Sequence, residues 1–246
     1  MVRAGWSNSL AMRISSPDCK QILPQTAAHD KMDADTTSVR IHFFICGINK
    51  GNKARGSIEK QMEVLQTERL CLRAFEEKDL EDYYAYCSDP EVGIHGGWPP
   101  HQNREQSREQ LQQLMEQKNS WAICQKDTGR NIGLVALRED IRRHRSPQNC
   151  RVLSYLLARP YWGRGLMTEA VQEVLRYAFE EMGLQLVSTY RFSYNQRSGR
   201  VMEKLGFVHE GTLRQCTERF DGQLLDVMCY SMNREEYEQW KQKNSR

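Results

Sequence analysis

The segment from Arg159 to Gly165 reads Arg-Pro-Tyr-Trp-Gly-Arg-Gly, and its residue types and position suit it to holding an anion. It follows a strand-like run that ends at Leu157 and precedes a run with helical spacing. A tight turn before a helix gathers unpaired backbone N–H groups, and the helix dipole adds partial positive charge. Gly163 lets the main chain approach closely, and Arg164 adds a full charge. The segment predicts a phosphate-binding turn, although many glycine turns only reverse the chain.

Two common nucleotide-binding motifs are missing from the sequence. It contains neither a Gly-x-x-x-x-Gly-Lys-Ser/Thr loop nor a Gly-x-Gly-x-x-Gly turn after a strand. Nucleotide hydrolysis and dinucleotide binding are therefore disfavoured.

Four further segments make the prediction more specific. Residues 67–73, 160–170, 195–198 and 203–211, followed by Asp221-Gly222, Asp226 and Tyr230, occur together in one order along the chain. In that order they resemble a GNAT-fold N-acetyltransferase, of the subgroup that contains ribosomal-protein N-terminal acetyltransferases. The resemblance covers residues from about 65 to 240. It implies an α/β (α+β) fold with a mixed, mostly antiparallel sheet, splayed central parallel strands and helices on both faces.

The resemblance also implies acetyl-CoA as cosubstrate, with its pyrophosphate on the glycine turn and its pantetheine arm between the splayed strands. The residues that it assigns to acetyl-CoA are Leu156, Leu157, Trp162, Gly163, Arg164, Gly165, Leu166, Met167, Asn195 and Ser198. The turn departs from the family pattern at one point. Pro160, which cannot donate a backbone hydrogen bond, stands where Gln or Arg is usual, and Arg159 lies one place earlier. A role for Arg159 is therefore left open.

The group that protonates the departing thiolate is a second departure. Many relatives carry a tyrosine four residues before the glycine that ends a helix, and this chain has Met202 there. A thioether cannot donate that proton. Ser198 lies one turn earlier and matches a serine that the closer subgroup places near the coenzyme sulfur. Ser198 is the predicted acid, and the alternative is a hydroxyl bonded within the first helical turn.

Acetyl transfer needs a neutral amine, a polarised thioester carbonyl and a way for the thiolate to leave. We expect direct attack without an acyl-enzyme, with a backbone N–H near Leu156 or Leu157 stabilising the carbonyl oxygen. Glu218 is the predicted base, from an alignment that needs a one-residue insertion, and an exposed ion pair is its alternative. Asp226 is the rival base. Cys216 has no histidine in a recognised arrangement, so a buried cysteine is the better interpretation.

Trp98, His101 and their neighbours in a predicted loop are expected to border the acceptor pocket, because this loop varies with substrate in the family. The predicted acceptor is a protein N-terminus, such as that of a ribosomal protein. A small polyamine or an amino-sugar is the alternative. A non-catalytic module that binds acetyl-CoA or a protein partner is the competing class, and Met202 favours it. A monomer or a homodimer is expected.

The elements that would position these residues follow from the spacing of apolar residues. Strands are predicted at 70–74, 121–124, 132–137, 152–157 and 184–192, and a hairpin joins strands 207–218 and 224–233. Helices are predicted at 79–87, 104–117, 167–183, 195–205 and 234–243, and a loop at 93–100. This order implies a mixed sheet covered by helices.

Composition narrows the class of protein. Charged residues make up 27% and hydrophobic ones 39%, which is typical of a globular protein. The sequence has no apolar run that could span a membrane and no secretory signal, so a cytoplasmic location is predicted. Eight cysteines are scattered without a zinc-knuckle spacing, and the six histidines do not cluster with them. Reduced, mostly buried cysteines and no metal are therefore expected.

Residues 1–61 show no sustained pattern, and regular patterning begins at Met62. They are predicted to be an irregular extension or to lie upstream of a true start at Met62, with the acetyltransferase domain at 62–246. These 61 residues hold nine Lys or Arg against five Asp or Glu, and the remainder holds 26 against 27. The domain therefore lacks the basic footprint of a nucleic-acid-binding protein.

Overall fold

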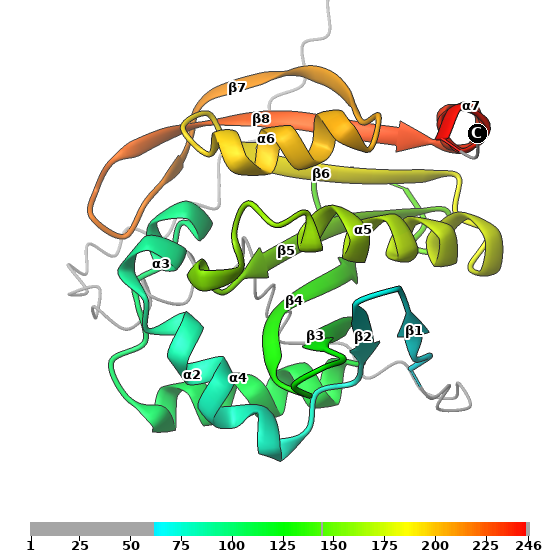
Figure 1. The fold of residues 1–246 in the computed structure, drawn as a ribbon. Helices are drawn as coiled ribbons and strands as arrows, with labels where there is room; N and C mark the ends of the chain where they lie inside the picture. The colour runs from blue at the N-terminus through cyan, green and yellow to red at the C-terminus, as the bar shows by residue number, and fades with distance from the viewer. Residues whose placement is uncertain (1–61, 144, 245–246) are drawn as a thin grey trace, which may run out of the picture. The chain divides into compact units, whose positions relative to one another are not determined.

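The computed structural model describes residues 62–143 and 145–244. The predicted extension at residues 1–61 lies outside these ranges. The described part contains an eight-stranded sheet in the order β1-β2-β3-β4-β5-β6-β8-β7, with helices packed on it (Figure 1). All neighbouring strands are antiparallel except β5 and β6, which are parallel. The predicted mixed, mostly antiparallel sheet is confirmed.

The predicted strands are present, with ends that differ by a few residues. They are β2 (Leu70–Arg73), β3 (Ser120–Gln125), β4 (Asn131–Arg138), β5 (Cys150–Leu157), β6 (Leu186–Phe192), β7 (Val208–Glu218) and β8 (Leu224–Asn233). The two-residue β1 (Leu65–Gln66) was not predicted, because two residues show no alternation.

The described helices are α2 (Leu80–Cys87), α3 (Pro90–Gly96), α4 (Arg104–Gln117), α5 (Leu166–Arg176), α6 (Gln196–Lys204) and α7 (Arg234–Asn244). The predicted helices match five of them. After α5 the chain continues through a π-helical turn, Tyr177–Glu181, and then reaches Gly183 at φ +74°. The predicted end of that helix near Gly183 is therefore confirmed.

The predicted loop at 93–100 is wrong in its first half, which belongs to α3. Asp89 caps this helix by accepting a hydrogen bond from Glu91 N, and Pro90 occupies its first turn. The glycines inside α3 are required by packing, not by a loop. A Cβ on Gly93 would lie 2.8 Å from the Trp98 carbonyl oxygen.

Alternation along β4 divides the core between the two faces of the sheet. All eight residues of β4 are buried. Val135 and Leu137 pack with α5 on one face, and Leu134 and Ala136 pack with α2 and α4 on the other. Burying one such aliphatic side chain contributes roughly 1.5–3 kcal/mol. The sheet is thereby held between two helical layers, and both layers reach the open ends of β5 and β6.

The parallel pair separates partway along its length. Residues 150–153 of β5 pair with residues 186–189 of β6, but β5 continues to Leu157 and β6 to Phe192 without further pairing between them. The predicted splaying of the central parallel strands is confirmed. The unpaired halves of the two strands leave space between their C-terminal ends.

The six cysteines in the described ranges are all free thiols, and Cys87, Cys124 and Cys150 are buried. Cys216 is exposed, so the interpretation of it as a buried cysteine is wrong. Cys216 lies on β7, an edge strand whose residues are nearly all exposed. The register between β7 and β8 also shifts between Leu213 and Thr217. No described helix is long and apolar enough to cross a membrane. No cluster of potential metal ligands occurs within the same residues.

Candidate active site

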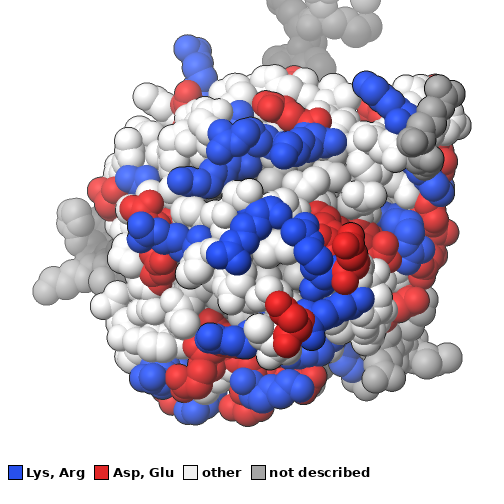
Figure 2. All heavy atoms as spheres, viewed as in Figure 1, with Lys and Arg blue, Asp and Glu red and all other residues white. Residues whose placement is uncertain are grey.

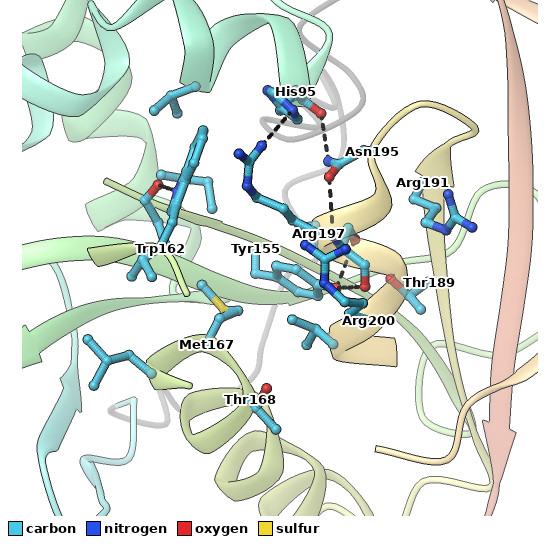
Figure 3. Close-up of a pocket in the computed structure, with 18 of the residues that line it drawn as sticks. His95, Tyr155, Trp162, Met167, Thr168, Thr189, Arg191, Asn195, Arg197 and Arg200 are labelled. Atoms are coloured by element: carbon cyan, nitrogen blue, oxygen red, sulfur yellow. Dashed lines mark hydrogen bonds between the residues drawn. The ribbon is translucent and has the colours of Figure 1, made fainter. Parts of the chain in front are cut away.

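A cavity of about 310 Å³ lies where β5 and β6 separate. Its walls are the unpaired ends of both strands, the turn after β5, the C-terminal half of α3 and the first turns of α6 (Figure 3). Leu156 and Leu157 line it, as does the aromatic ring of Phe192 across the gap. Nine of the ten residues assigned to the coenzyme by resemblance, all but Arg164, line this cavity, although they come from three separate segments.

The turn before α5 has the left-handed backbone conformation that glycine favours. Gly163 and Gly165 both have φ +77°, and Gly165 caps α5 in the left-handed conformation. Trp162, which also lines the cavity, donates a hydrogen bond of 2.6 Å from its indole nitrogen to the Leu157 carbonyl. This bond fixes the turn against the end of β5.

Leu166 and Met167, in the first turn of α5, also line the cavity. Arg164 and Arg159 do not. The Arg164 guanidinium lies 5.5 Å from the centre of the Tyr161 ring. The predicted contact of Arg164 with the coenzyme stays a prediction, and the backbone of the turn is the part that faces the cavity.

A carboxylate ties the turn to the start of the sheet. Glu169 accepts hydrogen bonds from Thr67 Oγ1 at 2.5 Å and from the Arg69 backbone at 2.9 Å. Burial acts to raise the pKa of the Glu169 carboxyl, but these bonds and the Arg69 guanidinium outweigh it, and the pKa is lowered. Arg69 in turn donates to the Arg164 carbonyl at 3.1 Å. The anion-binding turn is therefore braced from outside the cavity.

The N-terminus of α6 carries two of the predicted residues. The Asn195 side chain caps the helix by accepting from Ser198 N at 3.1 Å. Both residues line the cavity. Ser198 Oγ lies 2.9 Å from the Tyr155 hydroxyl, so its partner is a phenol on β5 and not a group within its own helix.

Tyr155 was missed in the sequence. It lines the cavity, and burial raises the pKa of its phenol, so the hydroxyl keeps its proton at neutral pH. Its place in a strand was predicted, but its contact with Ser198, 43 positions away, depends on how α6 packs on β5. Met202 lies in the core with 1% of its surface exposed and does not line the cavity.

The wall formed by α3 presents a histidine and a tryptophan. Trp98 is buried and lines the cavity. His95 also lines it: its Nδ1 is 2.8 Å from the Glu91 carbonyl and its Nε2 is 3.3 Å from the Arg197 guanidinium (Figure 3). Sequence reasoning missed His95 because it treated this segment as a loop. The Asp-Pro start and Gly97 end of α3 were the signals that could have found it.

His101 does not line the cavity. It is 3% exposed, its Nδ1 lies 2.6 Å from Ser107 Oγ, and its ring meets Tyr83 edge-on. The predicted role of His101 in acceptor binding stays a prediction that this placement does not support.

Glu218 is exposed at the end of β7, opposite Leu224, and does not line the cavity. Asp226 accepts a hydrogen bond from Gln215 N at 2.8 Å, which suits a role in fixing the β7 irregularity. In the described part of the chain no Asp or Glu lines the cavity. Glu218 as the base stays a prediction.

The charge at the cavity is positive. Arg197, Arg200 and Lys204, all exposed, line it from α6, and Figure 2 shows Lys and Arg gathered over this helix. Ser154 Oγ is buried at the cavity without a hydrogen-bond partner among the described residues. These cations, and the glycines with positive φ at the start of α5, fit a ligand with phosphates at one end. The unpartnered hydroxyl, where the strands separate, fits a long ligand with amides along its length.

Comparison with known proteins supports this geometry. Residues 69–208 match the family model described as an acetyltransferase (GNAT) domain. An uncharacterised N-acetyltransferase of Bacillus licheniformis, p20, is 32% identical over 182 residues, which are 72% of this chain and 99% of the relative.

Solved structures share the fold at lower identity. The ribosomal-protein-S5-alanine acetyltransferase of Vibrio fischeri superposes with a TM-score of 0.59 at 21% identity, covering 71% of this chain and 98% of that one. Mutant forms of a spermidine/spermine N-acetyltransferase of Vibrio cholerae give a TM-score of 0.55 at 22% identity, covering 70% and 98%.

Proposed function

Since this chain belongs to the GNAT acetyltransferase family and is an acetyl-CoA-dependent N-acetyltransferase, we propose that its acceptor is the α-amino group of a protein N-terminus. The observation that carries this proposal is the absence of Asp and Glu from the cavity wall in the described residues. A polyamine holds several ammonium groups, and each would need a carboxylate or a comparable partner when it leaves water. The cavity offers cations instead.

The ordinary pKa values of amines point the same way. An α-amino group has a pKa of about 7.7–8.0, whereas an alkyl ammonium such as that of lysine has one of about 10.4. A site without a carboxylate binds a cation poorly. It therefore favours the amine that loses its proton more easily, which is the α-amino group. The lining of the cavity also includes Trp98 and Phe192, two aromatic residues suited to the apolar part of a terminal residue.

The coenzyme site follows from the same cavity. The backbone of the glycine turn, together with Arg200 and Lys204, would hold the phosphates, and the unpaired ends of β5 and β6 would hold the pantetheine arm. Bound acetyl-CoA supplies a thioester carbonyl that an amine can attack. A backbone N–H near Leu156 or Leu157 is the proposed donor to the carbonyl oxygen.

The hydroxyl pair of Tyr155 and Ser198 is proposed to protonate the leaving thiolate. The Tyr155 phenol carries a proton at neutral pH and is 2.9 Å from Ser198 Oγ, so a proton given by one hydroxyl can be replaced by the other. This arrangement supplies the phenol that α6 lacks at Met202.

The acceptor is tested by measuring free thiol released from acetyl-CoA with a panel of amines. We expect release with peptides that have free N-termini, and a kcat/KM at least about tenfold lower with spermidine or glucosamine. The same peptides with blocked N-termini are the matched control and should give no release. Turnover with spermidine or glucosamine but not with any free peptide would overturn the proposed acceptor.

Tyr155→Phe is expected to lower kcat by about 100-fold while KM for acetyl-CoA changes little, because it removes a proton donor and leaves the ring in place. Ser198→Ala should have a similar effect, and the double variant should lose much less than the product of the two, since both hydroxyls serve one proton transfer. An unchanged kcat in Tyr155→Phe would show that the phenol has no part in the reaction.

A further inference from the structure

The amine that attacks the thioester must lose a proton, and the cavity limits which group can take it. Arginine and lysine side chains carry only donors when charged, and tyrosine and serine hydroxyls accept a proton poorly at neutral pH. No Asp or Glu is among the described lining residues, and His95 is the one histidine among them. A neutral imidazole has a ring nitrogen that can accept a proton.

We propose that His95 is the catalytic base that accepts the proton of the acceptor amine. This inference rests on the proposed transfer to an amine in this cavity. It gives a role to a residue of α3, an element separate from those that carry Tyr155 and Ser198.

The hydrogen bonds of the His95 imidazole determine which ring nitrogen carries the free electron pair. Nδ1 lies 2.8 Å from the Glu91 carbonyl, which can only accept, so Nδ1 carries the hydrogen. Nε2 is 3.3 Å from the Arg197 guanidinium, which can only donate, so Nε2 carries the electron pair. A backbone carbonyl thus fixes the tautomer, as an orienting group does for a catalytic histidine.

The surroundings hold the ring at the cavity. Trp162 meets it at 5.4 Å between ring centres, and the Tyr194 ring lies at 6.2 Å. The charged and titratable groups that face His95 in the described residues are Arg197 from α6 and Tyr194 from the segment before α6. Arg197 is exposed and also stacks on Trp162, so its single bond to Nε2 is weak and an amine can replace it.

A chain of contacts connects His95 to the Tyr155–Ser198 pair. The His95 carbonyl accepts from Asn195 Nδ2 at 3.1 Å, and Asn195 Oδ1 accepts from Ser198 N at 3.1 Å. Ser198 Oγ then meets the Tyr155 hydroxyl (Figure 3). Asn195 therefore links the backbone of His95 to the backbone of Ser198.

The proton balance is as follows. His95 Nε2 takes one proton from the ammonium form of the acceptor and becomes imidazolium. The neutral nitrogen forms the C–N bond, the C–S bond breaks, and the thiolate receives a proton from the Tyr155–Ser198 pair. The nitrogen loses its second proton, which restores that pair, and His95 returns its proton to water.

The test compares His95→Gln with the unmodified enzyme, using acetyl-CoA and a peptide with a free N-terminus. We expect kcat to fall by about 100-fold at pH 6.5, with an unchanged thermal shift on adding acetyl-CoA. At pH 9.5, where an α-amine is neutral in water, the defect should shrink to less than about tenfold. Added imidazole should restore part of the rate of His95→Ala. His209→Gln, an exposed histidine outside the cavity, is the matched control and should match the unmodified enzyme.

The outcomes separate the alternatives. A defect of equal size at both pH values, without imidazole rescue, would reduce His95 to a structural residue and overturn the proposal. Near-normal activity in His95→Gln together with a large loss in Glu218→Gln would assign the base to Glu218. If the unmodified enzyme acetylates another amine but no peptide, the proposed acceptor fails while the His95 test can still be run with that amine.

Discussion

Gly165→Glu is expected to abolish binding of acetyl-CoA. Gly165 has φ +77° and begins α5, so a side chain there is strained and a carboxylate would stand where phosphate is expected. At about 100 times its Kd, acetyl-CoA should stabilise the unmodified protein by roughly 2.7 kcal/mol, which raises Tm by roughly 5–10 °C. In Gly165→Glu the shift should disappear, and thiol release should disappear with it.

The control for this prediction is Gly129→Glu. Gly129 lies in the turn between β3 and β4, has φ +69° and has open space around its Cα. Its substitution therefore carries the same kind of backbone strain without a charge in the cavity. Gly129→Glu should keep the full thermal shift. A full shift in Gly165→Glu would mean that the turn does not bind the phosphates.

Gly133→Ala is expected to have the second largest effect, on stability and on coenzyme affinity together. An added Cβ would collide with the Leu156 carbonyl oxygen and would lie 3.0 Å from Leu157 Cα. Both are backbone atoms, so β5 itself must move. Overpacking of this kind costs about 2–3 kcal/mol and should lower Tm by roughly 5–10 °C.

The displaced residues of Gly133→Ala are those that border the coenzyme gap, so the Kd for acetyl-CoA should also rise. Urea unfolding and titration calorimetry measure the two effects separately. Gly129→Ala is the control: it strains a left-handed turn by about 1–2 kcal/mol but should leave the Kd unchanged. A destabilised Gly133→Ala with an unchanged Kd would show that the gap tolerates movement of β5.

Elements with long, regular patterns were predictable from the sequence. α4 begins and ends where its spacing indicated, with Leu111 and Leu114 buried on its apolar face. α3 was not predicted, because Gly93 and Gly96 argue against a helix in isolation. The reason for these glycines is that Trp98 packs against them. Such a contact leaves no periodic pattern in the sequence.

The residues of the candidate site also fall into a predictable group and an unpredictable one. The glycine turn and Asn195 are local motifs, and the sequence located them. Tyr155 and His95 were missed because the contacts that mark them as candidates are made with residues of another element. His101 was chosen for its nearness to Trp98 in sequence, yet its side chain bonds to Ser107 of α4 instead.

Met202 was the feature that favoured a non-catalytic module. The structure weakens that reading, because Met202 belongs to the core and the cavity obtains a phenol from β5. Tyr155 is the residue proposed above for the part that a tyrosine on α6 plays in many relatives. Sequence comparison along a single helix would not reveal it.

The separation of β5 from β6 also creates two sheet edges in the interior of the molecule. Exposed strand edges pair readily with strands of other molecules and promote aggregation. Here α3 and α6 line the same gap, and Tyr194 and Asn195 bond to the carbonyls of Ile94 and His95 across it. The two open edges are therefore enclosed by α3 and α6, which keeps them from pairing with strands of other molecules.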